Sequence, residues 1–535
     1  MDLQVPTPKG AREVAKAGNV NYEVPTSSTR QISEIAPLFV KLPPFQRKEE
    51  VDVRYALIPP YTYVHIHFDV KRGELIYEVE EPILSEREKD LLIILEKGIE
   101  EIIDVSFLRE KSKDAILTYL EKTTKLLIKE LNLDVSEESY DKIFYYLYRD
   151  FLGLNEIEPI MRDYYIEDIG CNGVNTPLFV IHRHYRNMRT NLIYRNIENL
   201  GSFVEKLAQR CNRYVSYASP ILDGTLPDGS RVNATYTTDI TSKGPTFSIR
   251  KFTKTPFTPI QLIKFGTISP EMLAYFWILV QYKSNILITG GTGTGKTTLL
   301  NAISFFIPPE DRVVSIEDTR EINLPRENWL PSVSRTGTGL GKIGEVSLFD
   351  LLKGSFRQNP DYVIVGEVRG NEAYVLFQGM ASGHASISSM HADSVDTIIK
   401  RLETQPINLS PTLVNTLDVV AVMTQTIVAR REIRKLREIV EIVNVNPNGI
   451  AVTNTPLIWN PADDNFYFKT ESQVFKKIAR KYGISEQELV RELQLRARLL
   501  YEMYRRNIIE FITVQQLINQ YYKNPNAILE RFGIK

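Results

Sequence analysis

The feature that most constrains the fold is a glycine-rich octapeptide, Gly-Gly-Thr-Gly-Thr-Gly-Lys-Thr at residues 290–297, which matches the phosphate-loop pattern G-x-x-x-x-G-K-S/T. A short apolar run precedes it at residues 285–289, and apolar residues at helical spacing follow it until Pro308. A strand, a glycine loop and a helix in this order bring backbone N–H groups and a helix N-terminus to one spot, where they bind phosphate. The pattern therefore predicts an α/β domain that binds a nucleoside triphosphate.

Two side chains of this loop carry specific chemistry. Lys296 is expected to reach the β- and γ-phosphates, and the hydroxyl of Thr297 is expected to coordinate Mg²⁺, which prefers oxygen ligands. ATP and Mg²⁺ are therefore the predicted ligands. The predicted nucleotide-binding residues are Gly290, Gly291, Thr292, Gly293, Thr294, Gly295, Lys296, Thr297 and Thr298.

Length and composition limit the alternatives. A chain of 535 residues exceeds the size at which one hydrophobic core keeps growing, so two or more domains are expected. A net charge of -1 gives no global attraction to nucleic acid or anionic lipid. The two cysteines, the lack of an apolar run of about 18 residues and the lack of a signal peptide predict a soluble cytoplasmic protein. At a membrane it would act through a protein partner.

The chain is predicted to contain an N-terminal α+β domain with a helical bundle and a RecA-like phosphate-loop domain with a parallel sheet and right-handed crossovers. A proline-rich, polar start predicts a flexible arm, and a segment rich in proline and threonine predicts a hinge. The predicted boundaries are 1–45 for the arm, 46–250 for the N-terminal domain (helical part about 85–160, sheet part about 165–250), 251–259 for the hinge, and 260–535 for the RecA-like domain with a helical extension from about 472.

Residues 53–79 alternate between apolar and polar in the manner of strands. Within them, His65 and His67 fall on one strand face. We interpret this pair as a solvated or half-buried surface in preference to a ligand site.

Acids and histidines follow the strands predicted after the loop. Residues 312–316 lead into the acidic run 317–321, and residues 361–365 lead into Gly366 and Glu367. Ligands of open α/β sheets bind beyond the carboxyl ends of the strands, so Glu367 is predicted to be functional. The acidic run is either functional or an ordinary solvated charge cluster. His384 and His391 bracket a further strand-like stretch and form a second candidate pair.

The order of these motifs resembles the secretion and type IV pilus ATPase superfamily. The matching segments are the phosphate loop, Ile-Glu-Asp-Thr-Arg-Glu at 316–321, residues 359–369, and Ser382-Gly383-His384 through His391. Upstream, residues 226–233 and 248–252 resemble the archaeal branch, whose members drive archaella, pili or related secretion. Residues 1–160 carry no match.

The resemblance implies roles for six residues. Glu321 would be the general base or the residue that positions water, and Glu367 an atypical second metal ligand beside Thr297. His384 and His391 would form a histidine box, with His391 placed to sense the γ-phosphate. Arg231 and Arg250 would neutralise charge on the transferring phosphoryl group, unless they are ordinary exposed strand residues.

The resemblance also implies a homohexameric ring at the inner face of the cell membrane, docked on a polytopic platform protein. ATP would be hydrolysed to ADP and phosphate between two domains that swing about the hinge. One alternative is a RecA-like motor that translocates nucleic acid, although only residues 430–435 are locally basic. Another is a phosphotransferase or a nucleotide-controlled scaffold with little turnover.

Overall fold

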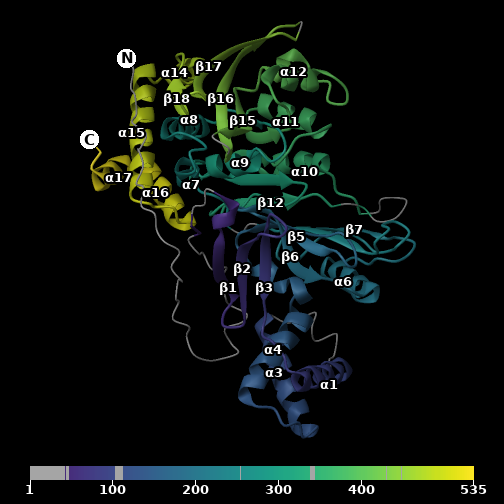
Figure 1. Ribbon diagram of the computed structural model, residues 1–535. Coiled ribbons are helices and arrows are strands. Elements are labelled where there is room, and N and C mark those ends of the chain that lie inside the picture. The colour runs from purple at the N-terminus through teal and green to yellow at the C-terminus, as the bar shows by residue number, and fades with distance from the viewer. Residues whose placement is uncertain are drawn as a thin grey trace. The chain divides into compact units, whose positions relative to one another are not determined.

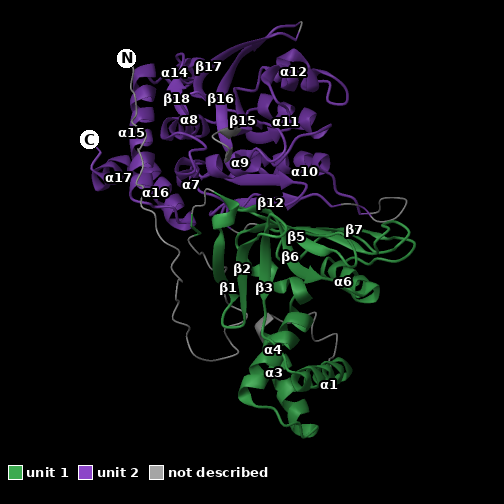
Figure 2. Ribbon diagram, in the orientation of Figure 1, with its two compact units in different colours: residues 1–252 green, residues 253–535 purple. Residues whose placement is uncertain are grey.

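The chain divides into two compact units. A computed structural model describes residues 42–43, 47–102, 113–252, 255–335, 337, 344–428, 431–447 and 449–534. The units comprise residues 1–252 and 253–535 (Figure 2), and Figure 1 labels their elements. Apart from residues 42 and 43, the predicted arm lies outside the described residues, as do residues 253 and 254 of the predicted hinge.

Unit 1 is built on one nine-stranded sheet, in the order β1-β2-β3-β6-β5-β4-β9-β8-β7. Its strands are β1 (Asp52–Ile58), β2 (Thr62–Asp69), β3 (Glu74–Glu80), β4 (Ile166–Cys171), β5 (Pro177–His182), β6 (Arg186–Ile193), β7 (Ile221–Thr225), β8 (Arg231–Thr235) and β9 (Thr246–Arg250). The alternating residues 53–79 form β1 to β3, and β3 pairs with β6 in parallel. The sheet therefore includes strands that begin more than a hundred residues before 165, the predicted start of the sheet part. The alternation at residues 53–79 indicates strands, but it does not show which distant strand they pair with.

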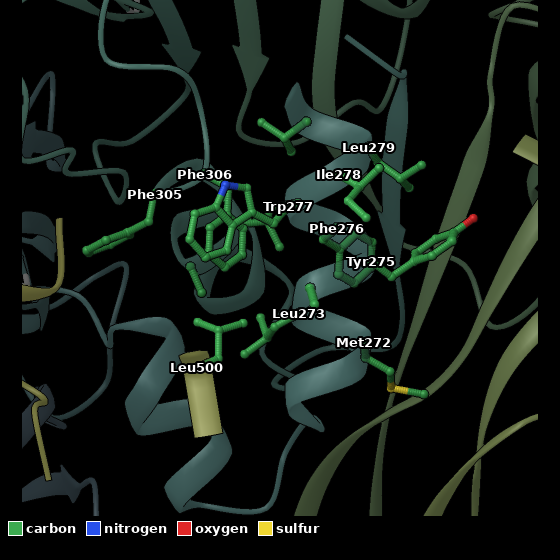
Figure 3. Close-up of a cluster of buried hydrophobic side chains, with 14 of the residues drawn as sticks. Met272, Leu273, Tyr275, Phe276, Trp277, Ile278, Leu279, Phe305, Phe306 and Leu500 are labelled. Carbon is green, nitrogen blue, oxygen red and sulfur yellow. The ribbon is translucent and has the colours of Figure 1, made fainter. Parts of the chain in front are cut away.

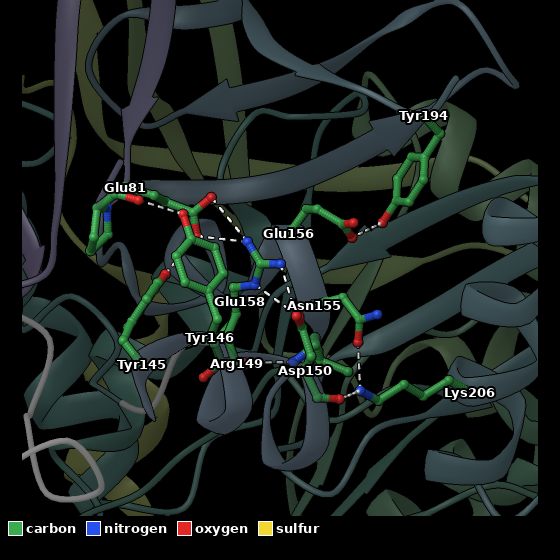
Figure 4. A network of polar contacts seen from close by, with 12 residues as sticks. Glu81, Tyr145, Tyr146, Arg149, Asp150, Asn155, Glu156, Glu158, Tyr194 and Lys206 are labelled. Carbon is green, nitrogen blue, oxygen red and sulfur yellow. Dashed lines mark hydrogen bonds and ion pairs between the residues drawn. The ribbon is translucent and has the colours of Figure 1, made fainter. Parts of the chain in front are cut away.

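The helices of unit 1 pack with this sheet into one hydrophobic core. They are α1 (Glu86–Ile102), α3 (Lys113–Glu130), α4 (Glu137–Leu147), which continues as a π-helical turn at Tyr148–Leu152, α5 (Glu158–Arg162) and α6 (Ile197–Arg210). Polar contacts also hold the helices in place (Figure 4). Buried Arg149 donates from Nη1 to Glu81 Oε1 at 3.0 Å and from Nε to Asp150 Oδ1 at 2.8 Å, while Lys206 of α6 donates to Asn155 Oδ1 at 2.5 Å. The buried guanidinium group of Arg149 is therefore paired with two carboxylates.

Unit 2 contains a second nine-stranded sheet, in the order β12-β11-β13-β14-β10-β15-β16-β17-β18. Its strands are β10 (Ile286–Thr289), β11 (Val313–Glu317), β12 (Trp329–Val333), β13 (Tyr362–Val365), β14 (Ala385–Met390), β15 (Val419–Val428), β16 (Arg431–Val445), β17 (Ala451–Asn460) and β18 (Asn465–Phe468). The first six strands in this order are parallel, which confirms the predicted α/β class.

The last four strands of that order form an antiparallel meander. The prediction of a parallel sheet in this domain is therefore wrong for β16 to β18. The charged residues at the start of β16 interrupt the alternation of apolar and polar residues that would indicate a strand. Further along β16, Leu436 and Ile439 are fully buried.

The helices of unit 2 cover the sheet and supply most of its core. They are α7 (Pro259–Lys264), α8 (Pro270–Gln281), α9 (Lys296–Ser304), α10 (Leu348–Ser355), α11 (Glu372–Ala381), α12 (Val395–Glu403), α13 (Pro411–Val414), α14 (Gln473–Tyr482), α15 (Glu486–Arg505), α16 (Phe511–Lys523) and α17 (Pro525–Phe532). Residues 272–280 of α8 are all buried, and the ring of Trp277 stacks on Phe306 at 5.0 Å (Figure 3). Tyr521 of α16 lies 5.0 Å from the same indole. The C-terminal helices thus complete this core.

Among the residues that the structure describes, no helix combines the length and the apolar character that crossing a membrane requires.

Candidate nucleotide-binding site

The glycine loop joins β10 to α9, and its backbone explains its composition. Gly290, Gly293 and Gly295 have φ values of 151°, 74° and 95°. A Cβ on Gly290 would lie 2.6 Å from the carbonyl oxygen of Met423 and 2.7 Å from Thr294 Oγ1, so no larger residue fits there. Gly295 is the N-cap of α9. The loop therefore directs the first N–H groups of α9 toward the space where an anion would bind.

Lys296 is the first residue of α9, and its side chain folds back over the loop. Its Nζ donates to the carbonyl oxygens of Gly290 at 3.0 Å and Gly291 at 2.8 Å, and it lies 3.2 Å from His391 Nδ1. Burial lowers the pKa of Lys296, and the charges of Glu367 and Glu321 oppose this effect. Two carbonyls and an imidazole thus surround the ammonium group.

His391 connects this lysine to the predicted acid. Its Nε2 lies 3.1 Å from Glu367 Oε1, while Nδ1 faces Lys296. Burial, followed by the charge of Lys296, lowers the pKa of His391. A neutral imidazole that accepts at Nδ1 satisfies the contact with Lys296, whereas the contact of Nε2 with Glu367 Oε1 is a close approach that is not aligned as a hydrogen bond. Lys296, His391 and Glu367 therefore form a continuous polar chain.

Glu367 is held from its other side by an arginine. Arg369 Nη2 donates to Glu367 Oε2 at 2.6 Å, and Arg369 Nη1 lies 4.0 Å from Asp318 Oδ2. The Glu367 carboxylate thus lies between an imidazole and a guanidinium group. Arg369 also brings the end of β13 near the acidic run after β11.

The acidic run contains a positioning residue that the sequence analysis missed. Glu317, the last residue of β11, is 2% exposed, and its Oε1 accepts the N–H groups of Glu321 and Ile322, each at 2.8 Å. Burial raises the pKa of Glu317 to about 8. Its buried carboxyl group fixes the backbone that carries the exposed side chain of Glu321.

A second missed residue holds the same segment from α9. Asn301 is 3% exposed, and its Nδ2 donates to the carbonyl oxygens of Thr297 and Glu321, each at 3.1 Å. Its Oδ1 accepts the N–H of Asn323 at 3.0 Å. The detectable signal in the sequence was an asparagine among the apolar residues of the helix that follows the loop.

These groups converge because their strands are parallel. The strand β14 lies between β10 and β13, and β11 pairs with the far side of β13. The glycine loop, Glu317, Glu367 and His391 each lie at or just beyond the carboxyl end of one of these strands. They therefore share one edge of the sheet.

His384 lies at the other end of β14. It precedes Ala385, and a strand of this length separates it from His391 by roughly 20 Å. Its ring packs 4.8 Å from that of Phe356, and both line a hollow of about 550 Å³. The structure thus does not bring His384 to the loop of its own chain.

Arg231 and Arg250 belong to unit 1. They lie opposite each other on β8 and β9. Arg231 pairs with Asp223 at 3.3 Å, and Arg250 pairs with Asp168 at 3.0 Å. Both side chains are exposed, so they could reach beyond these partners. Their role toward a nucleotide stays a prediction.

Comparisons with known proteins identify the family. The family model described as Type II/IV secretion system protein matches residues 173–523, which is more than half of the chain. The chain belongs to this family, and the resemblance seen in its sequence is confirmed.

Among the relatives is an uncharacterized protein, MJ0900, of Methanocaldococcus jannaschii, 39% identical over 397 residues, which are 73% of this chain and 71% of that protein. The type IV secretion system protein PtlH of Bordetella pertussis is 32% identical over 228 residues, 38% of this chain and 67% of PtlH.

Two solved structures are also similar. One is the VirB11 ATPase of the Brucella suis type IV secretion system, with 23% identity, a TM-score of 0.27, and coverage of 53% of this chain and 91% of that one. The other is the pilus retraction motor PilT with bound ADP, with 15% identity, a TM-score of 0.38, and coverage of 68% and 95%.

Proposed function

We propose that the chain is an ATPase that hydrolyses ATP to ADP and phosphate and thereby powers a secretion system or a type IV pilus-like filament such as an archaellum or archaeal pilus. The observation that carries the proposal is the polar chain of Lys296, His391 and Glu367 beside the glycine loop. Family membership supports the same conclusion.

The contacts of Lys296 fit a triphosphate. Its ammonium group is held by neutral carbonyl oxygens and an imidazole, and an anion at the start of α9 would attract it more strongly. Movement of Lys296 toward phosphate would break its contact with His391. This is how His391 would sense the γ-phosphate and transmit its presence to Glu367.

The surrounding groups also suit Mg²⁺. Thr297 and Glu367 would hold the ion, since a hydroxyl and a carboxylate are oxygen ligands of the kind it prefers. Bound Mg²⁺ would neutralise charge on the phosphates. Glu321 would orient or deprotonate the attacking water, with its backbone held by Glu317 and Asn301. Arg231 and Arg250 would supply further positive charge from unit 1.

We also propose that the chain works as a homohexamer on a polytopic membrane platform protein, at the cytoplasmic face of the membrane. Nucleotide binding would close residues 251–259 as a hinge, and hydrolysis would release them. The support is that the family is named for secretion systems and that PtlH is a type IV secretion system protein.

The geometry of β16 argues against a nucleic-acid motor. Residues 433–435 of the basic run lie in this strand, so their successive side chains point to opposite faces of the sheet. Lys435 is 4% exposed and pairs with Asp464 at 2.5 Å. The described side chains of the run, at 433–435, therefore do not form a continuous basic surface for a phosphate backbone.

The proposal is tested by measuring nucleotide binding and phosphate release on the full chain. Glu321→Ala is expected to retain ATP affinity and to lose turnover by about 100-fold or more, as expected for a group that orients or deprotonates water. The matched control is Glu310→Ala, because Glu310 is an exposed acid that precedes the amino end of β11. Wild-type turnover in Glu321→Ala would refute this role, and turnover that requires single-stranded DNA would favour the nucleic-acid motor.

A further inference from the structure

Unit 1 contains a cluster of side chains that the proposed ATPase does not use. On β2, Val64 and Ile66 are fully buried, so the alternate residues His65 and His67 lie together on the opposite face of the sheet. Glu78 on β3 lies directly across from His65, and Asp52 on β1 lies directly across from His67. Three neighbouring strands thus present two imidazoles and two carboxylates on one face.

The distances between these groups are short. His65 Nε2 lies 2.6 Å from Asp52 Oδ1, His67 Nδ1 lies 3.9 Å from Glu78 Oε2, and the two imidazole centroids are 4.6 Å apart. One ligand atom from each of His65, His67 and Glu78 lies within 4.8 Å of the others. Ligands of a tetrahedral zinc ion are about 3.4 Å apart, given metal–ligand distances of about 2.0–2.1 Å. Small side-chain rotations would close the cluster around an ion.

One imidazole nitrogen of the cluster lacks a hydrogen-bond partner, and a bound cation would supply one. His67 Nδ1 is buried, and it has no hydrogen-bond partner among the described residues. The nearby cation Arg54 is engaged elsewhere, because its Nε donates to Glu80 at 2.7 Å and its guanidinium lies 4.4 Å from the centre of the Tyr63 ring. An ion would give His67 a partner and would balance the carboxylates.

We propose that His65, His67 and Glu78, with Asp52 as the fourth ligand, bind a divalent transition-metal ion, with zinc as the best fit. Two imidazoles and carboxylates suit Zn²⁺ and similar ions, whereas Ca²⁺ and Mg²⁺ prefer oxygen-only sites. The bound ion would fasten β1, β2 and β3 to one another. Residues 52–78 lie outside the family match at 173–523.

The experiment uses the full chain, freed of metal with a chelator and titrated with Zn²⁺ against a chromophoric competitor. We expect one tightly bound ion per chain, a rise in the thermal unfolding midpoint on adding Zn²⁺, and no competition by millimolar Mg²⁺. The double variant His65→Ala/His67→Ala should weaken Zn²⁺ binding at least 100-fold and remove the thermal shift. Asp52→Asn should weaken binding by a smaller factor.

Two controls separate this site from other zinc ligands. The variant His184→Ala removes an exposed imidazole from outside the cluster and should leave tight Zn²⁺ binding unchanged. Circular dichroism shows whether each variant folds, and Glu78→Gln, which keeps nearly the same side-chain volume, repeats the test with less risk to folding. The proposal is overturned if the chain takes up no tightly bound Zn²⁺ or if the His65/His67 variant and Glu78→Gln both bind it as wild type does.

Discussion

The two edges of the parallel sheet in unit 2 both carry a lysine near an acid, yet they are built differently. At the amino edge, Lys283 Nζ contacts Asp361 Oδ1 directly at 2.8 Å, just before β13 begins. At the carboxyl edge, His391 separates Lys296 from Glu367, and no carboxylate among the described residues forms an ion pair with this lysine. The first lysine already has its counter-charge, whereas the second is positioned to receive one. This difference supports the proposal that the nucleotide binds at the carboxyl edge.

The largest expected effect is at Lys296. Lys296→Ala should abolish ATP turnover and weaken ATP binding strongly, since no other group on the loop supplies its charge to the phosphates. Lys283→Ala is the matched substitution at the amino edge, and it should keep nucleotide binding. It should change stability by about 1 kcal/mol or less, because Lys283 is partly exposed. Calorimetric titration and phosphate-release assays on both variants test the comparison. An equal loss of turnover in the two variants would contradict the proposed difference between the two edges.

The next effect separates the two ends of β14. His391→Ala should lower turnover by roughly 10- to 100-fold, as does loss of a residue that orients another group. His384→Ala should stay within about 2-fold of wild type, because β14 itself separates His384 from the loop. Steady-state measurement of ATP turnover in His391→Ala and His384→Ala tests this difference. A large loss in His384→Ala would mean that this histidine reaches a nucleotide bound by another copy of the chain.

The smallest effect concerns Glu317 and the pH dependence of stability. Its pKa is about 8 in the folded chain and near 4.3 when unfolded, so the folded state holds an extra proton between these values. The free energy of unfolding should therefore fall as pH rises through this window, by at most about 1.4 kcal/mol per pH unit from this group. Glu317→Gln keeps the Oε1 acceptor for Glu321 and Ile322 and removes the titration, so it should flatten this slope.

This prediction is checked by urea unfolding between pH 5.5 and 8.5. Glu310→Gln is the control, because Glu310 is exposed near the amino edge and should leave the wild-type slope unchanged. If Glu317→Gln loses stability as steeply as wild type when pH rises, Glu317 is ionised in the folded state and the account of its burial is wrong.

The predicted site residues that the structure brings together share one property. The glycine loop, Glu367 and His391 each follow a short buried strand, and parallel strands bring their carboxyl ends to one edge. Pattern and spacing were therefore sufficient to group them. The same reasoning grouped His384 with them, although it precedes its strand.

Other features depend on contacts that spacing does not reveal. Glu317 and Asn301 act through hydrogen bonds to the backbone near Glu321, and the sequence around them suggests only a charged run and an apolar helix. The parallel pairing of β3 with β6 joins segments more than a hundred residues apart. The histidine pair on β2 was visible in the sequence, but Glu78 and Asp52 join it only through strand register.

The account rests on the claim that the carboxyl edge of unit 2 binds a triphosphate. A crystal structure of the full chain with Mg²⁺ and a non-hydrolysable ATP analogue tests this claim most directly. The account predicts phosphate density at the N-terminus of α9, with Lys296 Nζ moved from the carbonyls of Gly290 and Gly291 onto a phosphate oxygen. An analogue bound elsewhere, or an unchanged Lys296 beside an empty loop at saturating analogue, would contradict it.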